Sequence, residues 1–174
     1  MHALTVRQPW AELIVAAKKS IEIRTWWPRV QFPMLVAIHA GTQVDQNAPR
    51  ELWTAKSWSS TGRGERLGGI IGVVRFVDQI RFGSDPYYRR QGGGVRMMSA
   101  SLGRERWEGM ADQHLNPLDW WADNLVGWRF DQPVRFPELI PCRGKQGLWV
   151  LPDDVAAEVE RALAQVGSGE GHTR

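Results

Sequence analysis

The sequence has few of the residues that small proteins use for covalent or metal-based chemistry. Cys142 is the only cysteine, which excludes an intrachain disulfide and any site that needs several cysteine ligands. Four histidines are scattered along the chain, and no pair has the spacing of metal ligands on one helix face. Glycine patterns typical of phosphate loops and dinucleotide-binding folds are missing as well. We therefore expect no metal and no cofactor.

Long apolar runs are also missing. No stretch of about 18 apolar residues appears, and the N-terminus has no charged segment followed by an apolar one, so we expect neither a membrane span nor a secretory signal. The sequence thus predicts a cytoplasmic protein. With 174 residues, 43% of them hydrophobic, it is long enough for one domain with its own core. We expect this domain over 1–152, a C-terminal helix over 153–166 and a disordered tail over 167–174.

Lysine is rare, and most of the positive charge comes from arginine. Only four of the 22 basic residues are lysine. The net charge is +3, but residues 153–174 carry five acids and two bases, which leaves 20 bases and 14 acids in the rest of the chain. Arginine suits bidentate contacts with phosphate and stacking on bases. The basic body therefore indicates RNA or single-stranded nucleic acid as a partner.

The basic residues are densest in the middle of the chain. Between Arg75 and Arg106 there are seven arginines and three acids, interleaved with tyrosines and glycines. We interpret about 82–124 as a Gly/Arg-rich insertion that includes Arg89 and Arg90. One interpretation is a basic flap that follows a nucleic-acid backbone, and the other is a solvated insertion between two elements.

The most informative stretch is near the N-terminus. Its pattern predicts a strand over 4–6, a helix that begins at Pro9 and ends near Lys18, and a strand over 20–25. Alternation in the second strand places Glu22 and Arg24 on one face. Polar side chains gather at the ends and faces of these elements, so we expect a ligand site formed by Arg7, Gln8, Lys19, Glu22 and Arg24.

Ten tryptophans are an unusually large number for this length. Trp128 and Trp149 lie in predicted strands and are expected to face the core. By contrast, Trp10, Trp26 and Trp27 are neighbours of the polar residues in sequence, where an indole face can stack on a base. His39 ends a predicted buried strand over 34–39, and it either lines the cleft or is a hydrogen-bonded core histidine.

Five segments together resemble the ASCH domain, a branch of the PUA-like β-barrels. They are Arg7-Gln-Pro-Trp10, Lys19-x-x-Glu22-x-Arg24, Leu35-x-x-Ile38-His-Ala40, Gly69-Ile-Ile-Gly-Val-Val74 and Ile140-Pro-Cys-Arg-Gly-Lys-x-Gly-Leu-Trp149. The resemblance implies an α+β fold, a single PUA-like open β-barrel of about five or six strands decorated with short helices. It departs from the family pattern at Ala17, where the family usually has glycine.

For function, the resemblance implies a cleft that binds RNA or a modified nucleoside. Some relatives are amidohydrolases that deacylate N4-acetylcytidine, and a ribonuclease activity is reported for others. In the amidohydrolases the lysine of the motif is catalytic, and Lys19 matches it. A threonine follows three residues later in those enzymes, whereas this chain has Glu22.

The chemistry of these residues fits more than one function. In a binder, the Lys19–Glu22 pair meets a base edge while Arg7 or Arg24 meets phosphate. In a hydrolase, Glu22 acts as general base on water, with Lys19 as its electrostatic partner. A purely structural alternative is that Glu22 and Arg24 tie the helix end to the sheet. We expect recognition of RNA or a modified pyrimidine nucleotide, with N4-acetylcytidine hydrolysis and ribonuclease activity as alternatives.

Overall fold

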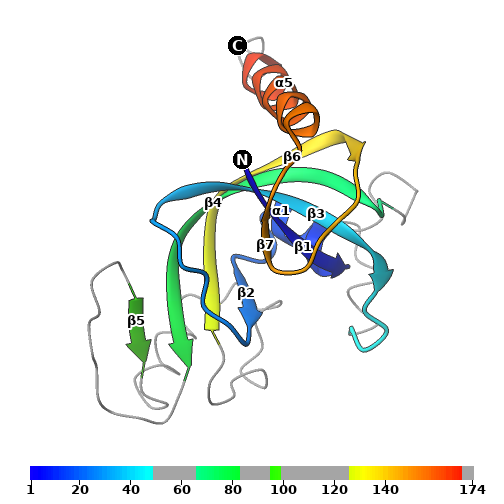
Figure 1. Ribbon diagram of the computed structural model, residues 1–174. Helices are drawn as coiled ribbons and strands as arrows, with labels where there is room; N and C mark the ends of the chain where they lie inside the picture. The colour runs from blue at the N-terminus through cyan, green and yellow to red at the C-terminus, as the bar shows by residue number, and fades with distance from the viewer. Residues whose placement is uncertain (49–65, 83–94, 99–125, 170–174) are drawn as a thin grey trace. The chain divides into compact units, whose positions relative to one another are not determined.

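A computed structural model of the chain describes residues 1–48, 66–82, 95–98 and 126–169 (Figure 1). They form two compact units. The first contains 1–17, 35–74 and 132–174, and the second contains 18–34 and 75–131. The elements in chain order are β1 (His2–Gln8), α1 (Trp10–Val15), β2 (Ile21–Arg24), β3 (Met34–Val44), β4 (Gly69–Phe82), β5 (Val95–Met98), β6 (Val126–Pro141), β7 (Leu148–Val150) and α5 (Asp153–Gly169).

In the first unit, β1 lies between β3 and β7. It pairs with β3 in parallel and with β7 antiparallel, so Leu4 has Ile38 on one side and Leu148 on the other. A central strand is buried on both faces, which fits the full burial of Ala3 and Leu4. Directly after β1, α1 buries all its residues beyond Trp10. The short helix therefore belongs to the core rather than to the surface.

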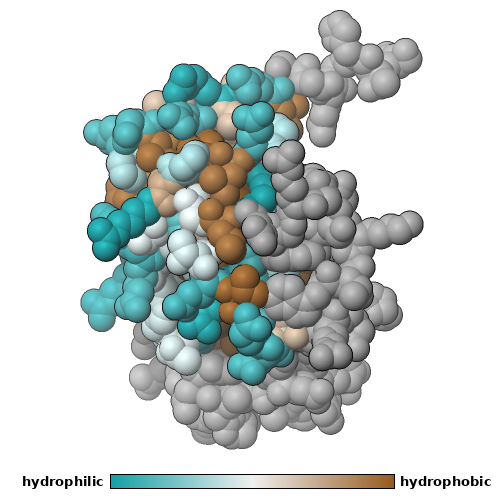
Figure 2. Space-filling model, turned by 90° about the vertical axis from the view of Figure 1, so that its right-hand side faces the viewer, coloured by the Kyte–Doolittle hydropathy of each residue, from teal (hydrophilic) through white to brown (hydrophobic). Residues whose placement is uncertain are grey.

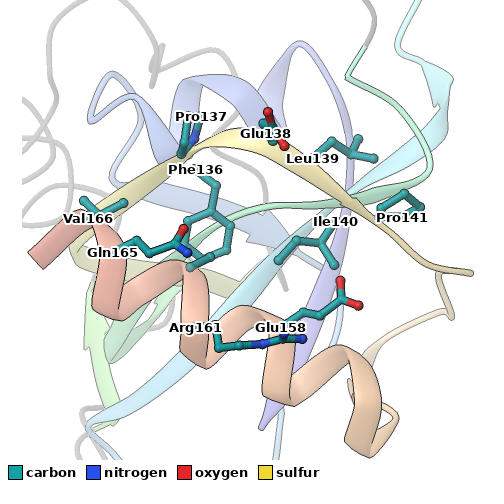
Figure 3. A pocket seen from close by; sticks show the side chains of 11 residues that line it. Phe136, Pro137, Glu138, Leu139, Ile140, Pro141, Glu158, Arg161, Gln165 and Val166 are labelled. Carbon is teal, nitrogen blue, oxygen red and sulfur yellow. The ribbon is translucent and has the colours of Figure 1, made fainter. Parts of the chain in front are cut away.

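The long C-terminal helix α5 packs on the second half of β6. Val155 and Val159 of the helix are buried in one cluster with Phe136, Ile140 and Trp149. Phe136 and Ile140 point from β6 toward the helix in Figure 3. In Figure 2, hydrophilic side chains lie at the height where Figure 1 draws α5, and apolar surface lies below them. The helix thus completes the core of the first unit with one apolar side and keeps a charged side outside.

In the second unit, β2 pairs with the start of β6. The register is antiparallel and places Glu22 opposite Trp128. Phe76 of β4 stacks on Trp128 with ring centroids 4.8 Å apart, and it also contacts Phe130 and Phe32 edge-on. An aromatic core of this kind gives a place to part of the large number of tryptophans.

The predicted α+β class is confirmed, but the predicted barrel is not. Hydrogen bonds link the strands in the order β2-β6-β4-β3-β1-β7, with β5 beside β4. Within the described residues the two end strands do not pair, so the sheet does not close. Residues 126–141 form one long strand, β6. Its Pro133, Pro137 and Pro141 lie beyond the residues that β2 pairs with, where a missing N–H is tolerated.

Several expectations fall outside the described residues. These are the Gly/Arg-rich insertion apart from β5 and the end of the predicted tail beyond 169. The C-terminal helix α5 itself extends from Asp153 to Gly169.

The turn that leads from α1 to Lys19 contains a strained alanine. Ala17, which stands where glycine was expected from the resemblance, has φ of 59°. An alanine in this left-handed region costs about 1 kcal/mol, because its Cβ crowds the backbone. We expect Ala17→Gly to raise the free energy of unfolding by about that amount, measured by urea denaturation. The matched control is Ala16→Gly, because Ala16 has φ of −85° and gains nothing from glycine. A destabilised Ala17→Gly variant would contradict the argument.

Candidate functional site

Three charged side chains of the second unit form one cluster. Nζ of Lys19 lies 2.7 Å from Oε2 of Glu22, and Nη2 of Arg24 lies 3.1 Å from Oε1. Lys19 also donates a hydrogen bond to the carbonyl of Ile21. Each oxygen of the carboxylate therefore contacts a different cation, and the three residues together carry one positive charge. We call Lys19, Glu22 and Arg24 the charged cluster.

The charged cluster is largely removed from water. Lys19 is 3% exposed and Glu22 8%, whereas the side chain of Arg24 keeps 24% of its surface exposed. Burial lowers the pKa of Lys19, while the charge of Glu22 and its hydrogen bond oppose that shift. A buried ion pair of this kind is costly to form, because both groups lose their hydration. Arg24 is the member of the charged cluster that reaches the surface.

Two tryptophans border the charged cluster. Trp128 is the cross-strand neighbour of Glu22, and cross-strand neighbours place their side chains on the same face of a sheet. Trp26 contacts Trp128 edge-on, with ring centroids 4.7 Å apart. Trp128 is completely buried, whereas Trp26 is half-buried. The indole N–H of Trp128 has no hydrogen-bond partner in the part of the chain that the structure describes. The charged cluster is thus joined to an aromatic wall whose outer member is Trp26.

The other predicted ligand residues belong to the first unit. Gln8 is fully buried, and both ends of its amide are used internally: Oε1 accepts from the backbone N–H of Glu12 and Nε2 donates to the carbonyl of Arg66. Trp10 donates from Nε1 to Oδ2 of Asp45, 2.8 Å away. Arg7 is exposed. Gln8 therefore fixes the start of α1, and Arg7 is the residue of this group that faces solvent.

His39 is a buried residue of the first unit. It is 1% exposed, and its Nε2 lies 3.1 Å from the carbonyl oxygen of Cys142. Burial lowers the pKa of His39, so the neutral imidazole is favoured. The ring packs against Gly144 and lies edge-on to Trp149. Of the two alternatives drawn from the sequence, the structure supports the hydrogen-bonded core histidine.

A second charged group was not foreseen from the sequence. The side chain of Glu12 is 3% exposed and contacts two arginines: Nε of Arg135, and Nη1 of Arg66 at 3.6 Å. Arg66 also donates from Nη2 to the carbonyl of Phe136 at 2.9 Å. Its members come from α1, from the residues just before β4, and from β6. No spacing in the sequence signals this group, since its partners are more than 50 residues apart.

A groove of about 810 Å³ lies between β6 and α5 in the first unit. Figure 3 shows Glu158, Arg161 and Gln165 of the helix beside it, with Phe136 and Ile140 of the strand across from them. None of the predicted ligand residues lines this groove. It is a gap between a helix and a strand with mixed charges at its rim.

Other sequence expectations can be placed only in part. Arg89 and Arg90 lie outside the described residues. Among the residues that are described, no three side chains of His, Cys, Asp and Glu gather as metal ligands would. No helix in the described ranges has both the length and the apolar character needed to cross a membrane.

Comparisons with known proteins agree with the geometry of the N-terminal block. The family model of the ASCH domain matches residues 4–84. Residues 4–84 of this chain are thus similar to the ASCH domain. The matched range of the ASCH domain includes Lys19, Glu22 and Arg24, but it ends before Trp128, the cross-strand neighbour of Glu22. The aromatic wall of the candidate site is therefore completed from outside the matched range.

Solved structures agree on the fold. The crystal structure of ASCH from Zymomonas mobilis superimposes with a TM-score of 0.54 at 10% identity, and the alignment covers 92% of this chain and 93% of that one. This likeness supports a PUA-like fold. Two point variants of the Zymomonas mobilis protein align at 13% identity with TM-scores of 0.49 and 0.45, over 92% of this chain and 96% and 94% of theirs. No curated protein matches the chain.

Proposed function

We propose that this protein binds RNA and recognises a pyrimidine nucleotide, with or without a modification, at the charged cluster. The observation that carries the proposal is the arrangement of Lys19, Glu22 and Arg24. A buried carboxylate is held by two cations, and the group has an excess positive charge that reaches the surface through Arg24. A purely structural salt bridge between the turn and the strand would need only one cation.

Each member of the charged cluster has a role in this proposal. Glu22 is fixed by its two partners. Its carboxylate has lone pairs left that can accept a hydrogen bond from the exocyclic amino group of a cytosine. Arg24 meets a phosphate or a base carbonyl with the exposed part of its guanidinium. Lys19 is too buried to meet phosphate and instead holds Glu22 in place.

Trp26 supplies the stacking surface. It is half-buried against Trp128, which is itself stacked on Phe76, so the wall behind it is rigid. Stacking of a base on an aromatic side chain contributes about 1–3 kcal/mol. A base placed on Trp26 lies beside the charged cluster, which combines stacking with reading of the base edge.

The burial of Lys19 favours a second candidate function, hydrolysis of an N4-acylated cytidine. A lysine with a lowered pKa gives up its proton more readily than a solvated one, and its Nζ lies 2.7 Å from Glu22. In this candidate Glu22 takes a proton from water, the resulting hydroxide attacks the acyl carbonyl, and the proton passes to the departing amine through Lys19.

We expect Arg24→Gln to weaken RNA binding about tenfold, because a charge-assisted contact contributes about 1.5–3 kcal/mol. The measurement is fluorescence anisotropy of a labelled single-stranded RNA at low salt, with thermal unfolding to check that the variant folds. Arg29→Gln is the matched control: this exposed arginine belongs to the same unit, and its loss removes the same charge. A change of less than about twofold is expected there.

Three results would contradict the proposal. These are no RNA binding by the unmodified protein at low salt, an equal loss in both arginine variants, or equal affinity for cytidine-rich and purine-only RNA. In the same preparation, release of cytidine from N4-acetylcytidine that disappears in Lys19→Met would replace binding alone by the second candidate.

A further inference from the structure

The segment between β6 and β7 crosses the first unit as a basic strap, by which we mean residues 142–146. It has no regular secondary structure, and it includes Arg143 and Lys145, both exposed. The charged cluster is a feature of the second unit, and the strap belongs to the first. The strap contains most of the segment Ile140-Pro-Cys-Arg-Gly-Lys, which has no role in the proposed function.

Three contacts hold the backbone of the basic strap in place. The carbonyl oxygen of Cys142 contacts Nε2 of His39 at 3.1 Å, and the carbonyl oxygen of Lys145 accepts a hydrogen bond from Oγ1 of Thr5 at 2.7 Å. Between these two points Gly144 lies so close to His39 that a Cβ would come within 2.7 Å of Nδ1. A segment fixed at both ends and in the middle has little conformational entropy left to lose on binding.

The basic strap presents positive charge with no acid beside it in the sequence. No acidic residue occurs in 142–152 or in 1–11. Arg7 is exposed and lies two residues beyond Thr5, the strand residue that holds the strap. Nζ of Lys145 lies 5.9 Å from the ring centroid of Trp149, which orients the lysine by a cation–π contact. Arg7, Arg143 and Lys145 therefore lie on two segments that the hydrogen bond between Thr5 and Lys145 joins.

We propose that the basic strap, together with Arg7, binds the phosphodiester backbone of a nucleic acid without reading its bases. Two side chains that are two residues apart in an extended segment are separated by up to ~7 Å, which is of the order of the distance between neighbouring phosphates of one strand. The fixed backbone, the spacing and the cations without an acid in the same two segments together fit a repeating polyanion better than a single anion. This surface goes beyond the proposed function, because it needs no recognition of a base.

The experiment measures binding of the full chain to a labelled single-stranded oligonucleotide without bases, an abasic phosphodiester, over a series of salt concentrations. The double variant Arg143→Gln, Lys145→Gln should bind about tenfold more weakly at low salt. Its plot of log affinity against log salt should lose a slope of about 1.4, which corresponds to two phosphate contacts on a single strand. Thermal unfolding and circular dichroism check that both cations are removed without loss of the fold.

The matched control removes two exposed arginines elsewhere, with Arg29→Gln and Arg161→Gln. Its slope should change by less than about 0.4, half of one contact. An unchanged slope in the strap variant, or an equal change in both double variants, would overturn the inference. If the protein binds normal RNA but not the abasic strand, the basic strap has no such role and the proposed function stands. If it binds the abasic strand and also binds RNAs of different base composition with equal affinity, the proposed function fails and the role of the strap stands.

Discussion

Glu12→Gln should lower the free energy of unfolding by about 3 kcal/mol. Removing one member of a buried ion pair leaves the others buried without a counter-charge, and such losses are typically 3–5 kcal/mol. The lower end applies here, because the side chains of Arg66 and Arg135 remain 13% and 27% exposed and recover part of their hydration. Glutamine keeps the shape of glutamate, so the loss reports the charge rather than the packing. Urea denaturation with an unchanged m-value measures it.

Glu138→Gln is the matched control for this loss. Glu138 lies on the same strand as Arg135 and is exposed, so the same substitution should change stability by no more than about 0.5 kcal/mol. Equal stabilities of the two variants would show that the carboxylate of Glu12 contributes nothing through its arginines. Because Glu12 is also held by Gln8 through its backbone N–H, a loss of this size would identify the start of α1 as the region most sensitive to charge removal.

Gly72→Ala should destabilise the protein by about 3 kcal/mol, or prevent it from folding. A Cβ at Gly72 would collide with the backbone carbonyl oxygen of Val134 and come within 2.8 Å of Cγ1 of Val15. Overpacking in a core costs about 1–3 kcal/mol, and the upper end applies where the obstacle is backbone that cannot rotate away. The variant should show a lower midpoint of thermal unfolding, or expression only in insoluble form.

Gly167→Ala provides the comparison for Gly72→Ala. Gly167 lies in α5, and among the described residues no atom outside its own stretch of helix lies within 4 Å of its would-be Cβ. Alanine is favoured over glycine in a helix by about 1 kcal/mol, so this variant should be slightly more stable than the unmodified protein. A Gly72→Ala variant as stable as Gly167→Ala would contradict the close approach of α1 and β6 to β4.

The N-terminal block could be predicted because its signals are local. From Ile21 to Arg24, apolar and charged residues alternate, which predicts a strand. This spacing alone places Glu22 and Arg24 on one face. Lys19 is only three residues from Glu22, so a contact between them depends on little more than the intervening turn. Local signals of this kind do not indicate β6, because the strand continues through Pro133 and Pro137, and proline usually interrupts a strand. Among the described residues β2 pairs with 126–129 of β6 and not with the prolines, and only the strand register shows that.

Contacts between distant segments could not be predicted. Trp128 becomes the neighbour of Glu22 through a register that no spacing encodes, and a shift of one residue would turn it to the other face. Gln8 was expected to meet a ligand, but the structure uses its amide to hold α1 and Arg66. Trp128 and Arg66 are each more than 50 residues from the residue they contact, and they are brought near only by the packing of the core.

By itself, the sequence determined the ASCH motif, the arginine-rich charge and the order of charges around Lys19, because these depend on residue type and short spacing. Tertiary structure alone decided which charges are buried and which are not. It buried Lys19 and Glu22, left Arg24 and Arg7 at the surface, and gave Glu12 two arginines. The physical reason is that desolvation depends on every neighbour that excludes water, and those neighbours come from strands far apart in the chain.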